Sequence, residues 1–152
     1  MDKRLQTLAK IANALNAKGV RWAVGGSTLL YLKGIVFSFN DFDLSVMYED
    51  ALKAREALSE IGEYHPNNKS SKARIFDEFT VDGIDVDLVS EMRLDSYGQE
   101  VDCSFKNENV EHMEIEGADV VLDSLEAWYN IYNLQGRVEK ARYIKDYLLY
   151  HK

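Results

Sequence analysis

An Asp-Gly pair at residues 82 and 83 separates two runs in which apolar and polar side chains alternate. The runs are "ARIFDEFTV" before the pair and "IDVDLVS" after it. Asp-Gly accepts the left-handed backbone of a two-residue turn, and alternation is the side-chain period of a strand. The pair therefore predicts a β-hairpin, so the fold contains at least one antiparallel pair of strands.

Helical spacing marks the N-terminal segment. Apolar residues recur at that spacing from Leu5 to Leu15, and Gly19 is predicted to end this helix. Ser27 is predicted to cap a short helix that runs to about Lys33, with Gly34 as its terminator.

Strands and a further helix are predicted around this short helix. The apolar run 20–24 and the alternating run 42–48 predict strands. Asp50 is predicted to cap a helix over 51–61, which Gly62 ends. Residues 63–72, with the only proline, are predicted to form a loop.

The second half of the chain is predicted to contain an irregular segment and short strands, and to end in helices. Residues 91–109 are predicted to be irregular, and 110–122 to form one or two short strands. Asp123 and Glu126 have the spacing of a capping box, and Gly136 divides the helical stripes that follow.

Together these elements predict an α+β fold, with a small mixed sheet, flanking helices and two C-terminal helices. The 152 residues predict one domain, with a core over about 1–122 and a helical pair over about 123–150. Hydrophobic residues make up 46% of the chain, which is enough for a core without disulfides, and Cys103 is the only cysteine.

Charge and hydropathy narrow the classes of partner and location. The formal charge of −8 argues against bulk binding of nucleic acid, which favours a basic face. Charged residues and glycines interrupt the most apolar window, 20–39, so no membrane segment is predicted. A single thiol and the absence of a signal-peptide pattern are consistent with a cytoplasmic protein.

Gly25, Gly26 and Ser27 form the first of three segments that could carry chemistry. Two glycines after a strand let the backbone approach a ligand closely, and the amides that open a helix attract anions. The segment is consistent with a phosphate-binding loop, although by itself it more often indicates a plain turn from strand to helix.

The other two segments carry carboxylates. Asp41 and Asp43 are two residues apart at a strand start, so both should point to one face and could hold a hard cation such as Mg²⁺. Asp85 and Asp87 share one face of the predicted strand after the hairpin turn. Either could add a third carboxylate, and periodicity does not choose between them.

The order of these segments predicts nucleotidyl transfer. Two Mg²⁺ ions could clamp a displacement at phosphorus, with the glycines holding the leaving phosphates and the third Asp helping to deprotonate an acceptor hydroxyl. Arg137 and Lys140 lie one turn apart on a predicted helix, where they would either reach the triphosphate or form part of a solvated charged face.

The segments Gly25-Gly26-Ser27, Asp41-Phe42-Asp43 and Val86-Asp87-Leu88 resemble the motif set of the nucleotidyltransferase superfamily with the polymerase-beta-type fold. The similarity is closest to small stand-alone prokaryotic members, and "LQGRVEKARYIKDYL" (134–148) resembles their closing helices. The resemblance spans about residues 20 to 150. It implies that Asp87 fills the third acidic position, with Asp41 and Asp43 as the other metal ligands.

Two functions are consistent with these features. The first is an enzyme that moves a nucleoside monophosphate from a Mg-bound nucleoside triphosphate to a hydroxyl of a small molecule or a protein. The alternative is a weakly active or inactive module of the same fold, which acts by binding nucleotide or a partner protein, as an antitoxin binds its toxin. A second copy of the chain or such a partner could supply the acceptor, because the chain has little room for a separate acceptor-binding domain.

Overall fold

The computed structural model describes residues 2–66 and 73–151. A seven-stranded mixed sheet forms its centre, in the order β3-β4-β5-β2-β1-β9-β8, and β6 and β7 form a separate hairpin. The strands are β1 (Trp22–Gly25), β2 (Phe42–Val46), β3 (Glu63–His65), β4 (Ile75–Val81), β5 (Ile84–Ser90), β6 (Arg93–Ser96), β7 (Gln99–Asp102), β8 (Glu111–Ile115) and β9 (Ala118–Leu122). The predicted α+β fold with a small mixed sheet is confirmed.

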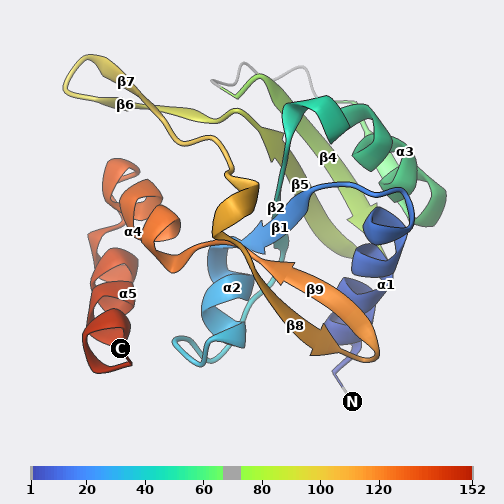
Figure 1. Cartoon of the computed structure of the whole chain (residues 1–152), viewed down its shortest axis with the longest axis horizontal. Helices are drawn as coiled ribbons and strands as arrows, with labels where there is room; N and C mark the ends of the chain where they lie inside the picture. The colour runs from blue at the N-terminus through green and yellow to red at the C-terminus, as the bar shows by residue number, and fades with distance from the viewer. Residues whose placement is uncertain (1, 67–72, 152) are drawn as a thin grey trace.

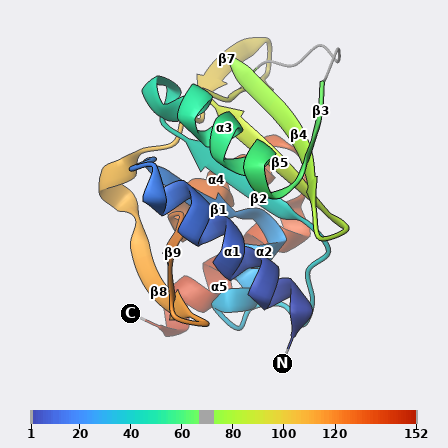
Figure 2. The same cartoon turned by 90° about the vertical axis from the view of Figure 1, so that its right-hand side faces the viewer.

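Helices cover the sheet on two sides, as Figures 1 and 2 show. The helices are α1 (Lys3–Ala17), α2 (Gly26–Leu32), α3 (Ala51–Ile61), α4 (Leu125–Leu134) and α5 (Val138–Tyr150). In both views α1 and α3 lie on the side of the sheet opposite to α4 and α5. Within the described residues no helix has the length and apolar character needed to cross a membrane.

Alternation along the strands builds the core. Phe42, Leu44 and Val46 of β2 are buried, and the residues between them are only half-buried. The buried face is continuous with Trp22 and Val24 of β1, which pair with Val46 and Leu44. The other face of β2 therefore carries Asp43 toward the side on which α4 and α5 lie.

The predicted hairpin is present at the predicted residues. β4 and β5 pair in antiparallel fashion from Val81↔Ile84 to Ile75↔Ser90. Asp82 and Gly83 both have a positive φ, of 51° and 80°, which is the backbone that a two-residue turn of this twist requires. The predicted helix ends at Gly19, Gly34 and Gly136 are also observed, each with a positive φ just beyond a helix.

Two segments predicted to be irregular contain strands. Glu63–His65 forms β3, which lies at the edge of the sheet and pairs with β4. A run of three residues is too short to show the periodicity of a strand, so it was not predicted. Within 91–109, β6 and β7 pair across a turn at Tyr97 and Gly98, both with a positive φ. The rest of the predicted loop, 67–72, lies outside the described residues.

Of the three predicted helix caps, the position of Asp50 before α3 is confirmed, and those of Ser27 and Asp123 are wrong. Gly25 precedes α2, so Ser27 lies within the first turn instead of capping it. Asp50 does precede α3, but its carboxylate accepts hydrogen bonds from the backbone and the side chain of Arg21. Ser124 caps α4 by accepting from the amide of Ala127 at 3.2 Å, and this leaves the Asp123 carboxylate for another role.

Candidate active site

Strand pairing brings the three predicted segments together. β1 and β2 are antiparallel with Gly25 opposite Asp43, and β2 and β5 are parallel with Asp43 opposite Asp87. The three residues therefore stand in one row across the sheet. Asp85 lies two residues earlier on β5, is exposed, and pairs with Thr80. The pairing thus brings Asp87, and not Asp85, beside Asp43.

Asp41 lies just before β2 and is exposed. The hydroxyl of Thr28, a buried residue of α2, donates a hydrogen bond to the Asp41 carbonyl at 2.8 Å. This bond fixes the backbone at the start of β2 to the helix that follows the two glycines. The sequence analysis did not single out Thr28, since a threonine within a helix gives no local signal of such a contact.

Each of the two glycines is in contact with a side chain that leaves no room for a Cβ atom. At Gly26, which has a φ of +59°, a Cβ would overlap the Oδ2 atom of Asp43. At Gly25 a Cβ would overlap the indole ring of Trp128. Glycine at these positions therefore lets the loop approach the Asp43 carboxylate on one side and α4 on the other.

A buried carboxylate holds Trp128 in place. Asp123 accepts hydrogen bonds from the Trp128 indole at 3.1 Å and from the amide of Ser124 at 2.8 Å, and its own amide donates to the Val24 carbonyl at 3.1 Å. Burial raises the pKa of the Asp123 carboxyl. This contact connects α4 to β1 next to Gly25. Asp123 has a positioning role that its sequence pattern did not reveal.

Replacing Asp123 with alanine should destabilise the protein by about 1–3 kcal/mol, because the indole N–H of Trp128 would lose its buried acceptor. The measurement is chemical denaturation of this variant against Asp119→Ala, which removes an exposed carboxylate of the neighbouring strand β9. Equal stability of the two variants would show that the Asp123–Trp128 bond does not hold α4 to the sheet.

The carboxyl of Asp43 is in a strongly perturbed electrostatic environment. Burial, together with the charges of Asp41 and Asp87, raises its pKa to about 6 against the opposing charges of Arg137 and Lys140. The charges of the other four side chains therefore lie near enough to Asp43 to influence its pKa. The repulsion among the three carboxylates is a cost that a bound cation would offset.

The two predicted basic residues approach this site from the C-terminal helices. Arg137 immediately precedes α5, and the Nζ of Lys140 lies 5.4 Å from the ring centroid of Tyr132 on α4. The hydroxyl of Tyr132 has a pKa raised to about 12 by burial and by the charge of Asp43. Arg137 and Lys140 therefore lie near enough to Asp43 for their charges to lower its pKa, and Tyr132, which the sequence analysis did not single out, lies beside Lys140.

The carboxylates are suited to a hard cation that takes some of its ligands from the substrate. Within residues 2–66 and 73–151, no group of three or more His, Cys, Asp or Glu side chains forms a ready-made metal cage. Mg²⁺ usually takes one or two protein carboxylates and completes its octahedron with water and substrate phosphates. The strained Asp43 carboxylate, flanked by Asp41 and Asp87, matches that requirement without a full cage.

Comparison with solved structures relates this arrangement to known proteins. The chain is similar to a candidate nucleotidyltransferase from Thermotoga maritima, TM1012, at 28% identity, with a TM-score of 0.75 over 98% of this chain and 94% of the other. No protein-family model matches the sequence, and no curated protein matches it significantly.

Two structures of the antibiotic-resistance factor ANT(2'')-Ia share the fold at lower identity. One, a complex with adenylyl-2''-tobramycin, is 13% identical with a TM-score of 0.66, over 97% of this chain and 90% of that chain. The other, a solution structure, is 14% identical with a TM-score of 0.64, over 97% and 86%. The chain therefore has the nucleotidyltransferase fold, which it shares with the candidate nucleotidyltransferase from Thermotoga maritima over nearly the whole length of both chains.

Proposed function

We propose that this protein is a Mg²⁺-dependent nucleotidyltransferase, which transfers a nucleoside monophosphate from a nucleoside triphosphate to a hydroxyl group. The observation that carries the proposal is the row Gly25, Asp43 and Asp87, with Gly26 pressed against the Asp43 carboxylate. A phosphate that approaches the glycine backbone would meet the carboxylates directly. The fold it shares with ANT(2'')-Ia, whose complex contains an adenylylated antibiotic, supports a hydroxyl acceptor.

Separate groups of residues would bind the phosphates and the metal ion. Gly25, Gly26 and the side chain of Ser27 would hold the β- and γ-phosphates, and Arg137 and Lys140 would balance their charge from the side of α5. Asp41, Asp43 and Asp87 would hold Mg²⁺, which would withdraw charge from the phosphate oxygens.

The reaction is a displacement at the α-phosphorus. The acceptor oxygen forms a bond to this phosphorus, the bond from the phosphorus to the bridging oxygen of the β-phosphate breaks, and pyrophosphate leaves. The proton of the acceptor hydroxyl moves to the carboxylate of Asp87, which pairs with Asp43 across β2 and β5. Every atom and charge is accounted for by the nucleotide, the acceptor and these side chains.

Thermal unfolding with a panel of nucleoside triphosphates, with and without Mg²⁺, tests the proposal. A ligand at about 100 times its Kd stabilises the folded state by about 2.7 kcal/mol, or roughly 5–10 °C in Tm for a domain of this size. We expect such a shift for at least one triphosphate, only with Mg²⁺, and its loss in the Asp41→Asn/Asp43→Asn variant. No shift with any triphosphate would refute the enzyme, and a shift without any transfer would identify a nucleotide-binding module.

Asp87 and Asp85 provide a matched pair for assigning the third carboxylate. Asp87→Asn should lower the rate of transfer by about 10²–10⁴-fold, the usual contribution of a positioned acid or base. Asp85→Asn, an equal change on the same face of the same strand, should leave the rate within about twofold. The measurement is pyrophosphate release at saturating nucleotide. The opposite order of the two variants would assign the role to Asp85.

A further inference from the structure

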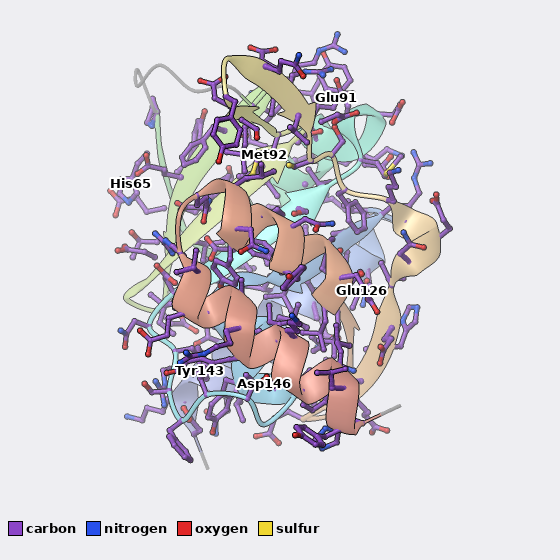
Figure 3. The ribbon with its side chains drawn as sticks, turned by 90° about the vertical axis from the view of Figure 1, so that its left-hand side faces the viewer. His65, Glu91, Met92, Glu126, Tyr143 and Asp146 are labelled. Carbon is purple, nitrogen blue, oxygen red and sulfur yellow. The ribbon has the colours of Figure 1, made fainter. Side chains whose placement is uncertain are left out.

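A cavity of about 540 Å³ lies beside the row of carboxylates. Its walls come from α4, the β6–β7 hairpin and the segment that follows that hairpin, and its floor includes Ser45 of β2 and Val89 of β5. Figure 3 labels Glu91, Met92 and Glu126, three residues of the lining, and shows the first two between α4 and the β6–β7 hairpin. The volume is within the range of sites that enclose a small molecule.

The floor of the cavity continues the row that holds the carboxylates. Ser45 pairs with Val89 on the same two strands on which Asp43 pairs with Asp87. Residues two apart on a strand point to the same face and are about 6–7 Å apart. The floor of the cavity is therefore one row of the sheet away from Asp43 and Asp87, within the reach of a small molecule bound there.

The lining of the cavity is mainly acidic. Its charged side chains are the carboxylates of Glu91, Asp102, Asp123 and Glu126 and the single ammonium of Lys106. The hydrogen-bond donors to Glu126 and Asp123 are neutral groups: Glu126 accepts from the Ser124 hydroxyl at 3.0 Å, and Asp123 accepts from an amide and an indole. Glu91 also forms an ion pair with Arg74, at 3.4 Å.

The rest of the lining combines apolar and amide groups. Val89, Met92, Phe105 and Ile131 supply apolar surface, and Asn130 on α4 supplies an amide that is exposed. Low-dielectric walls strengthen the field of the carboxylates within a cleft. Such a cavity favours a compact cation with hydroxyl groups, and it disfavours the phosphate backbone of a nucleic acid.

We infer that this cavity is the acceptor site, and that its acceptor is a small, positively charged polyhydroxyl compound such as an amino sugar. The inference rests on the proposed function, because only a nucleotide held at Asp43 makes the cavity an acceptor site. It adds the class of acceptor and the residues that select it. Glu91 and Glu126 bind the cation, and the apolar wall packs against the carbon skeleton.

Cys103 lines the same cavity and is the only cysteine of the chain, which makes it a reporter of occupancy. It is half-buried, so a bound molecule should shield it from N-ethylmaleimide. The probes are the trisaccharide of glucosamine and cellotriose, which have the same β-1,4-linked skeleton and differ only in the amino groups. At ten times its Kd, a ligand should slow alkylation about tenfold.

The expected result is protection by the glucosamine trisaccharide at pH 7 and none by cellotriose. Glu91→Gln/Glu126→Gln should remove this protection, whereas Glu114→Gln/Glu116→Gln, on the exposed β8–β9 hairpin, should retain it. Equal protection by both sugars, protection by neither, or protection that survives in Glu91→Gln/Glu126→Gln would overturn the inference.

Two further measurements separate this inference from the proposed function. The Mg²⁺-dependent thermal shift with nucleotide should be unchanged in Glu91→Gln/Glu126→Gln, because these residues are not among the groups that hold the nucleotide. Transfer of label from an α-labelled nucleoside triphosphate to the glucosamine trisaccharide should fall at least about tenfold in that variant at subsaturating sugar.

A thermal shift with nucleotide, but no protection of Cys103 by the sugar, would leave the proposed function standing and refute the acceptor site. Protection without transfer would refute its role as acceptor site.

Discussion

Replacing Asp43 with asparagine should abolish nucleotidyl transfer and, without divalent metal, make the protein more stable above pH 6. The carboxyl has a pKa near 6 in the folded protein instead of its usual 3.8. The folded state therefore holds the proton more tightly than the unfolded state. The stability that this proton contributes is complete below about pH 4 and is lost as the pH rises through 6. Asparagine is neutral throughout and avoids the loss.

Asp43→Asn should change both the stability of the protein and the rate of transfer by measurable amounts. A shift of about two pKa units corresponds to at most ~3 kcal/mol, and partial solvent access reduces this to about 1–2 kcal/mol, or roughly 3–6 °C in Tm. Loss of Asp43, the proposed metal ligand, should lower the rate of transfer by about 10²–10⁴-fold. The measurements are Tm in EDTA between pH 4 and 8 and pyrophosphate release at pH 7.5.

Asp85→Asn is the matched control, because it removes an exposed carboxylate two residues before Asp87 on β5. It should change neither the rate nor the pH dependence of Tm. Mg²⁺ with nucleotide should reverse the order of stability, since the wild type gains a ligand that the Asp43→Asn variant cannot bind. If wild type and Asp43→Asn had parallel Tm profiles in EDTA, the Asp43 carboxylate would not be under electrostatic strain.

Gly26→Ala should have the second large effect, on both folding and activity. The residue has a φ of +59°, which costs about 1–2 kcal/mol for any side chain, and the new Cβ would overlap the Asp43 carboxylate. We expect a total loss of about 2–4 kcal/mol of stability. A displacement of Asp43 by about 1 Å should lower the rate of transfer by about 10²-fold.

Gly83→Ala separates backbone strain from the contact with Asp43. Gly83 has a φ of +80° in the β4–β5 turn, and nothing lies within 4 Å of a Cβ built there. This variant should lose about 1 kcal/mol and keep its activity. Adding Asp43→Ala to Gly26→Ala should recover part of the lost stability, since the overlap disappears, without recovery of transfer. Identical behaviour of Gly26→Ala and Gly83→Ala would show that Gly26 matters only for its backbone.

Much of the fold could be predicted because the decisive signals are local. The turn at Asp82 and Gly83, the helix ends at Gly19, Gly34 and Gly136, and the alternation of Phe42, Leu44 and Val46 each depend on a few neighbouring residues. The strand β3 could not be predicted, because its three residues become a strand only by pairing with β4. The turn at Tyr97 lacks the Asn or Asp that usually marks such a backbone.

The site was predictable where one strand determined it and not where distant segments meet. Periodicity placed Asp41 and Asp43 on one face, but only the register of β2 with β5 distinguishes Asp87 from Asp85. Asp123 has the spacing of a helix cap, and its bond to Trp128 depends on how α4 packs against β1. Side chains that act across elements leave no pattern in either element alone.

The pairing of Val24 with Leu122 has a consequence for the way the protein is made. The central strand β1 is synthesised well before its neighbour β9 and before Trp128, Arg137 and Lys140. Such long-range pairing slows folding, and until it occurs the nascent chain exposes one side of β1. The proposed site would therefore form only after the chain has been synthesised as far as Lys140 and α4 has docked against β1.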